Sequence, residues 1–303
     1  MADRSRSERR EDLTPCWKEE RSMETLQQII EYPYFLEKSP HKRWIFRGVT
    51  DYRYGLESTL DRAIARGEAE YWTSKRRWRY EATTLHNFKR RAQHYLPPAA
   101  VPAPQDFLEW LSLIRHFGGP SRLLDFSYSF FVATYFAVQG GSDDAGVYCI
   151  DHGWLTGLVA RALLKADEYF QRPNIFWKHV FGRSAVKPPR PVVIPVRPFR
   201  SNERIHVQQG LFLCPTDVGK TFLENLRDMT DPDVTRAHIV KLKIPGNIRG
   251  EVIRRLYDMN ISAETLYPGL DGFTATLGDL AFLTDRLPSD VRLCGILQEK
   301  PHF

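Results

Sequence analysis

The chain of 303 residues lacks the features of disulfide-rich, zinc-binding and membrane-spanning proteins. Its cysteines are few, widely separated and without a C-x-x-C pair; they are Cys16, Cys149, Cys214 and Cys294. This spacing predicts neither a disulfide framework nor a zinc site. No apolar run reaches the roughly 20 residues that span a bilayer, and the N-terminal residues have no hydrophobic stretch of the signal-peptide type. We therefore expect a cytoplasmic protein that has no membrane partner.

Several common catalytic signatures are also absent. The sequence contains no G-x-G-x-x-G after a strand, no G-x-x-x-x-G-K-[ST], no H-E-x-x-H and no G-x-S-x-G. The glycine-rich segment 118–121 lacks the lysine of a phosphate-binding loop. These absences argue against a Rossmann dehydrogenase, a P-loop kinase, a zinc protease and an α/β-hydrolase, and no metal site is predicted.

What the chain has is apolar residues and locally concentrated positive charge. Hydrophobic residues make up 42% of it, enough for a sizeable core. Residues 74–91 contain seven Lys or Arg and only Glu81, and residues 178–204 contain seven and only Glu203. Such clusters suit phosphate groups, so both segments are candidate contacts for nucleic acid or a charged cofactor. The alternative is that they are solvated faces balanced by acidic loops.

The order of helical and strand-like patterns predicts an α+β fold with a mixed sheet. Residues 1–20 lack apolar periodicity and are expected to be a mobile tail. Residues 21–303 are expected to form one domain, with a helical part at about 56–117 and a sheet-rich part at about 121–303. A β-prone run is expected within 205–213.

Arg47 is the first candidate functional residue, because it follows the apolar strand pattern Trp44-Ile45-Phe46. A guanidinium at the end of a buried strand needs an anion or several acceptors. It would either clamp a ligand phosphate or pair with an internal carboxylate such as Asp125.

Polar residues are densest in 111–137. His116 precedes two glycines, and is either a base or a helix C-cap. Ser127 and Ser129 lie at the start of an apolar helix, where they would bind an anion or simply cap the helix. Asp125 has an acid/base role, or it only fixes the turn or pairs with Arg122. Gln208 interrupts a later apolar run, and its amide would orient a ligand hydroxyl or bond to a neighbouring backbone.

Ordered blocks between about residues 43 and 280 resemble the FRG domain family. Phe46-Arg47-Gly48 is the tripeptide that gives the family its name. Residues 113–127, LIRHFGGPSRLLDFS, are similar to its L-x-Q-H-Y-G-x-P-T-R-L-L-D-W-T core, with Arg115 in place of Gln. Residues 131–137, 204–212 and 266–272 are similar to its V-A-L-Y-F-A, R-I-x-x-Q-x-G-x-F and L-F-P-x-L-D-G segments.

A weaker similarity, in layout alone, is to ADP-ribosyltransferases, and it implies an ADP-ribosyltransferase-like core that uses NAD as a substrate. The resemblance implies that Arg47 holds NAD, together with Arg122, Ser127, Ser129 and Tyr135. Gln208 would stand where these enzymes have a late glutamate. An amide can bond a ribose hydroxyl but cannot stabilise the positive charge on the ribosyl carbon. Either Glu203, Asp125 or Glu264 then supplies the anion, or catalysis is weak, or the chemistry differs.

The leading expectation is therefore an enzyme that transfers ADP-ribose to a macromolecule such as nucleic acid, with Arg47, His116, Asp125 and Gln208 as the catalytic set. Such an activity is compatible with a toxin or an antiviral defence effector. One alternative is a non-catalytic module that binds nucleotides or nucleic acid. Another is a hydrolase of NAD or of a phosphodiester, with His116 and Asp125 as the acid/base pair.

Overall fold

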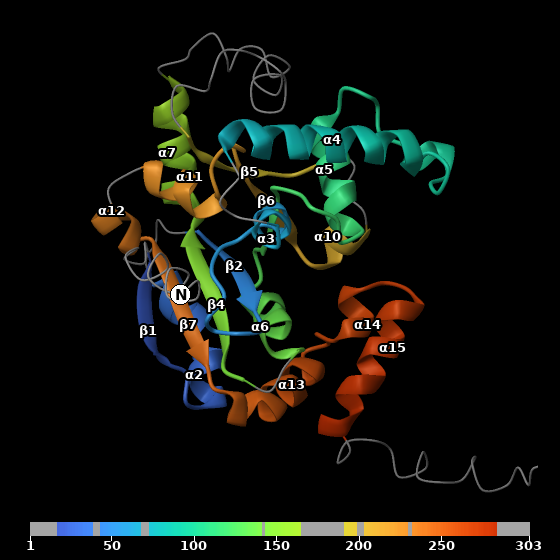
Figure 1. Ribbon diagram of the computed structural model, residues 1–303. Helices are drawn as coiled ribbons and strands as arrows, with labels where there is room; N and C mark the ends of the chain where they lie inside the picture. The colour runs from blue at the N-terminus through green and yellow to red at the C-terminus, as the bar shows by residue number, and fades with distance from the viewer. Residues whose placement is uncertain are drawn as a thin grey trace, which may run out of the picture.

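A seven-stranded sheet runs through the centre of the molecule (Figure 1). The computed structural model describes residues 17–38, 43–67, 73–140, 143–164, 191–198, 203–229 and 232–283. The strand order is β1-β7-β4-β2-β3-β6-β5, and all neighbours are antiparallel except the edge pair β1 and β7. The strands are β1 (Lys18–Ser22), β2 (Trp44–Val49), β3 (Leu124–Ser127), β4 (Ala145–Asp151), β5 (Val193–Val196), β6 (Gly210–Pro215) and β7 (Ile239–Ile244). The predicted combination of helices with a mixed sheet is confirmed.

The helices surround this sheet. They are α2 (Leu26–Glu37), α3 (Thr59–Ala65), α4 (Ser74–Ala92), α5 (Phe107–His116), α6 (Phe130–Val138), α7 (His152–Leu164), α10 (Glu203–Val207), α11 (Phe222–Asp228), α12 (Pro232–Arg236), α13 (Arg249–Asp258), α14 (Ala263–Leu266) and α15 (Leu270–Asp279). Ser or Thr side chains cap several of them, as at Ser58 for α3, Thr73 for α4 and Ser129 for α6. Among the residues that the structure describes, no helix is long and apolar enough to cross a membrane.

Three hydrophobic clusters hold the helices on the sheet. The largest joins one sheet face to α2, α6 and α13. The second joins the other face to α11 and to the start of α7. The third lies under α4 and α5 at the β5–β6 end, where α4 crosses the top of the molecule in Figure 1. The helical 56–117 segment therefore shares its core with the sheet-rich part.

Helix α6 lies directly on β2, and Gly48 makes this possible. A Cβ atom at Gly48 would lie 2.0 Å from the carbonyl oxygen of Ala133, so only glycine allows the helix backbone to come this close. Phe46, two residues earlier, packs against Phe130 of α6 with ring centroids 5.4 Å apart. The two neighbours of Arg47 thus fix the strand against the helix, and this fixes the position of Arg47 itself.

One expectation needs correction, and another is confirmed with narrower bounds. The predicted tail, residues 1–20, lies mostly outside the described residues, but residues 18–20 belong to β1, and the pairing of β1 with β7 supplies backbone partners that the sequence does not reveal. The β-prone piece expected within 205–213 is found as the start of β6 at Gly210, whereas residues 205–207 belong to helix α10. Gln209, with a φ of 49°, turns the chain between the two. Ile205 packs into the third cluster and thereby stabilises this short helix.

Candidate functional site

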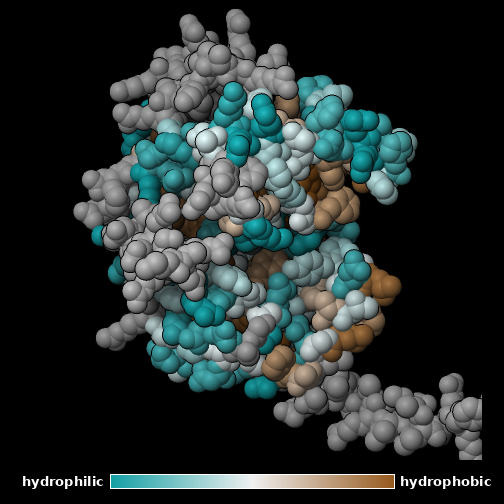
Figure 2. All heavy atoms as spheres, in the orientation of Figure 1, coloured by the Kyte–Doolittle hydropathy of each residue, from teal (hydrophilic) through white to brown (hydrophobic). Residues whose placement is uncertain are grey.

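A cleft opens beside the middle of the sheet. Strand β2 pairs with β4 along its whole length, but its register with β3 is recorded only at Phe46 and Ser127. The remaining part of β2 and the start of β3 instead line a cavity of about 1080 Å³. Figure 2 shows the surface hollowed between the part that carries α4 and α5 and the part that carries α14 and α15. The sheet therefore places the ends of two central strands at one opening.

Arg47 lies in this cleft with 13% of its side chain exposed. One terminal nitrogen, Nη1, donates to the carbonyl oxygen of Asp125 at 2.9 Å and lies 3.7 Å from the Asp125 carboxylate. Its buried Nε has no hydrogen-bond partner among the described residues. Burial lowers the pKa of Arg47 to about 10, and Asp125 opposes this shift, so the guanidinium stays charged at neutral pH. Arg47 is thus partly paired and still open to a ligand.

Asp125 is held mainly by Arg115, not by Arg122. Arg115 Nε donates to Asp125 Oδ2 at 2.7 Å, and Arg115 Nη2 lies 2.5 Å from the same oxygen. Burial raises the pKa of Asp125, but the positive charges of Arg115, Arg47 and Arg204 outweigh burial and leave this pKa below its ordinary value. The expected pairing of Asp125 with Arg122 is wrong. A carboxylate held this way is a positioning group and a weak base.

His116 ends helix α5 at the mouth of the cleft. The positive φ of Gly118, 75°, turns the chain away after the helix, as the two glycines predict. Partial burial, and then the charge of Arg204, lowers the pKa of His116. The imidazole is therefore mostly neutral at pH 7 and able to accept a proton.

Ser127 and Gln208 meet at the inner end of the cleft. Ser127 Oγ donates to the Gln208 carbonyl oxygen at 2.7 Å and accepts from the Ser129 N–H at 2.9 Å. Gln208 Nε2 donates to the carbonyl oxygen of Leu266 at 2.9 Å. Gln208 lies in the turn before β6, not on the expected strand. The bond to a neighbouring backbone is thus confirmed for the Gln208 nitrogen, and the residue also lines the cleft.

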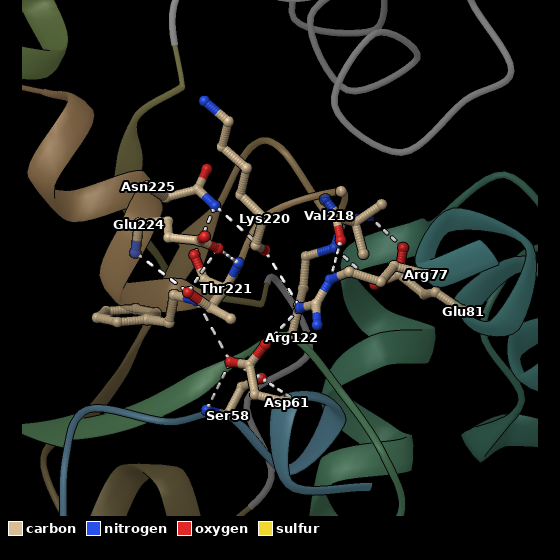
Figure 3. Close-up of polar contacts among 12 residues, drawn as sticks. Ser58, Asp61, Arg77, Glu81, Arg122, Val218, Lys220, Thr221, Glu224 and Asn225 are labelled. Atoms are coloured by element: carbon tan, nitrogen blue, oxygen red, sulfur yellow. Dashed lines mark hydrogen bonds and ion pairs between the residues drawn. The ribbon is translucent and has the colours of Figure 1, made fainter. Parts of the chain in front are cut away.

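Three predicted cofactor-binding residues do not line the cleft. Arg122 is 2% exposed and forms a bidentate ion pair with Glu81 of α4, part of a network shown in Figure 3. Ser129 caps α6 by accepting from the Val132 N–H, which is the capping role that the sequence predicts as the alternative to anion binding. Tyr135 is 2% exposed, and its hydroxyl donates to Asp279 at 2.8 Å. Arg122 and Tyr135 are thus buried among partners within the protein, and Ser129 is half-buried.

One comparison with known proteins gives a family match. Residues 42–145 match the family model of the FRG domain. The predicted resemblance to this family is confirmed over these residues. The comparison with curated proteins and the comparison with solved structures found no match. The match contains Arg47, His116, Asp125 and Ser127, so the FRG domain supplies most of the predicted site.

Residues that follow the FRG domain match complete the cleft. Arg204 of α10 lies 4.5 Å above the ring of Tyr267, which follows α14, and both line the cavity. A Cβ atom at Gly272 would lie 1.9 Å from the Tyr267 carbonyl oxygen, which accounts for the glycine in the 266–272 block. This wall is aromatic and cationic at once, a surface that suits a nucleobase or a phosphate.

Positive charge dominates the cleft. Its lining contains six arginines, Arg47, Arg53, Arg62, Arg115, Arg204 and Arg227, and two carboxylates, Glu57 and Asp125. Neither Glu203 nor Glu264, the alternative anions, lines it. Sequence reasoning missed Arg115, Arg62 and Glu57; only the charge that Arg115 adds to the family pattern was visible in advance. In the described part of the chain, no group of three or more His, Cys, Asp or Glu residues could hold a metal ion.

Proposed function

We propose that the cleft binds NAD and that the protein transfers ADP-ribose from it to a macromolecule. The observation that carries this proposal is that Arg47, His116, Asp125, Ser127 and Gln208, chosen from the sequence, line one cavity. Arg53 is already paired with Asp51 and Asp143, and the other five arginines, against two carboxylates, attract a pyrophosphate. The volume of about 1080 Å³ is ample for a dinucleotide.

Each residue has a defined part in this reaction. Arg47 binds the pyrophosphate through the part of its guanidinium that is exposed to the cleft. Arg115 holds Asp125 beside Arg47 and keeps the carboxylate ionised. Gln208, anchored through Ser127 and Leu266, presents an amide oxygen at the inner end, where it accepts from a ribose hydroxyl.

The chemical step is a substitution at the ribosyl carbon next to nicotinamide. The bond from this carbon to the nicotinamide nitrogen breaks, and its electron pair leaves with nicotinamide. The acceptor oxygen or nitrogen forms the new bond to the same carbon. Its proton passes to the neutral imidazole of His116. Asp125 is the carboxylate inside the cleft that faces the developing positive charge. Arg115 and Arg47 partly screen the negative charge of this carboxylate.

A second candidate function is nucleotide binding without turnover. It is favoured by the engagement of Asp125 with Arg115 and by the neutral amide at position 208. Under this alternative the cleft binds NAD or a related dinucleotide, but no carboxylate is strong enough to promote loss of nicotinamide.

The test measures nicotinamide release and label transfer from NAD labelled in its adenylate part, with RNA, DNA and protein as acceptors. We expect release and transfer by the native protein and a loss of at least about tenfold in NAD affinity for Arg47→Gln, because a charged bidentate contact is removed. Arg66→Gln, which removes an exposed arginine outside the cleft lining, is the matched control. NAD binding without turnover would select the second candidate, and no binding at all would overturn both.

A further inference from the structure

We propose that the exposed face of α4 and the hollow at its C-terminal end bind single-stranded nucleic acid and present it as the acceptor. The acceptor role rests on the proposed function, whereas the binding itself does not. The surface is defined here as the α4 face and consists of Lys75, Arg76, Arg79, His86, Asn87, Arg90, Arg91, His94 and Tyr95.

Three cations and one histidine of the α4 face lie along one side of the helix. Lys75, Arg79, His86 and Arg90 follow one another at intervals of four, seven and four residues, which is a single helical stripe. All four are exposed. From Lys75 to Arg91 the helix rises by about 24 Å. This length suits the roughly 4–16 nucleotides that a single-strand binding surface contacts.

These charges are not neutralised from within the helix. The only acid of α4, Glu81, is buried and paired with Arg122. Arg77 points inward to Asp61, and Lys89 donates to the Pro104 carbonyl oxygen. In the described parts of the chain, no ion pair is recorded for Lys75, Arg79, Arg90 or Arg91. The helix thus has Arg77 and Glu81 paired on its inner side, and Lys75, Arg79, Arg90 and Arg91 exposed on its outer side.

The C-terminal end of the α4 face adds groups that recognise a base. A hollow of about 420 Å³ is lined by Asn87, Arg90, Arg91, His94 and Tyr95. Tyr95 is 84% exposed, so its ring is available for stacking. Arginines bind phosphate, an aromatic ring stacks on a base that is not already stacked in a duplex, and an amide bonds to a base edge. This combination favours a single strand over a duplex.

Ion pairs and packing against α5 hold α4 on the body of the molecule. Arg77 and Arg122 bind α4 to the body of the molecule (Figure 3). Phe88 of α4 packs against Trp110 of α5 with ring centroids 6.2 Å apart. Helix α5 ends at His116, the proposed base of the transfer step. A strand bound on α4 is therefore held by the same helix pair that places His116.

The experiment measures the fluorescence anisotropy of labelled 20-nucleotide single-stranded RNA, single-stranded DNA and duplex DNA, titrated with the full chain at several salt concentrations. The test variant is the triple substitution Arg79→Gln, Arg90→Gln and Arg91→Gln. We expect at least about tenfold weaker binding and a shallower salt dependence, because fewer counterions are released. Tyr95→Ala should weaken single-strand binding about fivefold or more and leave duplex binding unchanged.

The matched control is the triple Lys38→Gln, Arg66→Gln and Arg255→Gln, which removes the same charge from exposed positions elsewhere. An equal loss in the control would overturn the proposal, since binding would then follow net charge alone. Tighter binding of the duplex would overturn it as well, and so would transfer of label to protein only. Nicotinamide release without an acceptor should be unchanged in the α4 triple variant, so failure of α4 binding and failure of NAD cleavage are separate results.

Discussion

Two groups of arginines in this protein differ in how completely they are paired. The buried network consists of Arg122 with Glu81 and Arg77 with Asp61, and their side chains are 2–10% exposed. The cleft group consists of Arg47 and Arg115 around Asp125, whose side chain is 43% exposed. Both groups consist of arginines and carboxylates, but the first group is buried in the protein and the second is exposed to the cleft.

The partners explain the difference. Arg122 donates to both oxygens of Glu81 and to the carbonyl oxygens of Pro215 and Thr216. Burial alone would lower the pKa of Arg122, and the Glu81 carboxylate raises it above the ordinary value. In the cleft, one carboxylate serves two guanidiniums, and Arg47 Nε has no partner among the described residues. A closed network of this kind fixes α4 in place, whereas the cleft retains positive charge for a ligand.

The largest expected effect comes from breaking the buried network with Glu81→Gln. Arg122 would remain charged at 2% exposure without its carboxylate, and we expect the free energy of unfolding to fall by about 3–5 kcal/mol. Urea unfolding followed by circular dichroism measures the loss. Arg79→Gln, on the exposed side of the same helix, should change the stability by less than about 0.5 kcal/mol. Equal losses in both variants would show that the buried ion pair contributes no more to the free energy of unfolding than an exposed arginine does.

A smaller effect on stability is expected from Arg47→Gln. The side chain makes one hydrogen bond to the Asp125 backbone and a long ion pair at 3.7 Å, so its removal should cost about 1 kcal/mol or less. The same urea titration provides the measurement. A loss as large as that of Glu81→Gln would make Arg47 a structural group and would remove the basis of the proposed function.

The sequence predicts where the helices and strands lie better than it predicts how they pack and how deeply each residue is buried. Thr73 and Ser129 cap helices α4 and α6, and two glycines follow α5, so these helix ends can be located from the sequence. The pairing of β1 with the distant β7 and the helical start of the 205–213 segment depend on contacts with remote parts of the chain. Local patterns do not contain that information.

The same limit applies to the candidate site. Arg47 and Arg122 both follow or precede apolar residues, and the sequence gives no sign that one meets a cleft and the other meets Glu81. Arg115 was visible only as an added charge within a familiar block, and its pairing with Asp125 depends on how α5 lies against β3. Motifs thus locate the polar residues, and tertiary packing decides which of them remain open.

The smallest effect is expected from Asp125→Asn, which removes the carboxylate partner of Arg47 and Arg115 in the cleft group. The variant removes one negative charge from beside Arg47 and Arg115, and we expect pyrophosphate to bind about fivefold more tightly at low salt by calorimetry. The variant should bind pyrophosphate more tightly but be less stable than the native protein. Because the folded-state pKa of Asp125 lies below its ordinary value of 3.8, its carboxylate stabilises the fold above that value and ceases to do so as the pH falls through the folded-state pKa. The native protein should therefore be slightly more stable than the variant at pH 7, and the difference should disappear on acidification below about pH 4. Weaker pyrophosphate binding by the variant would contradict this account, because Asp125 would then be assisting the ligand instead of competing with it.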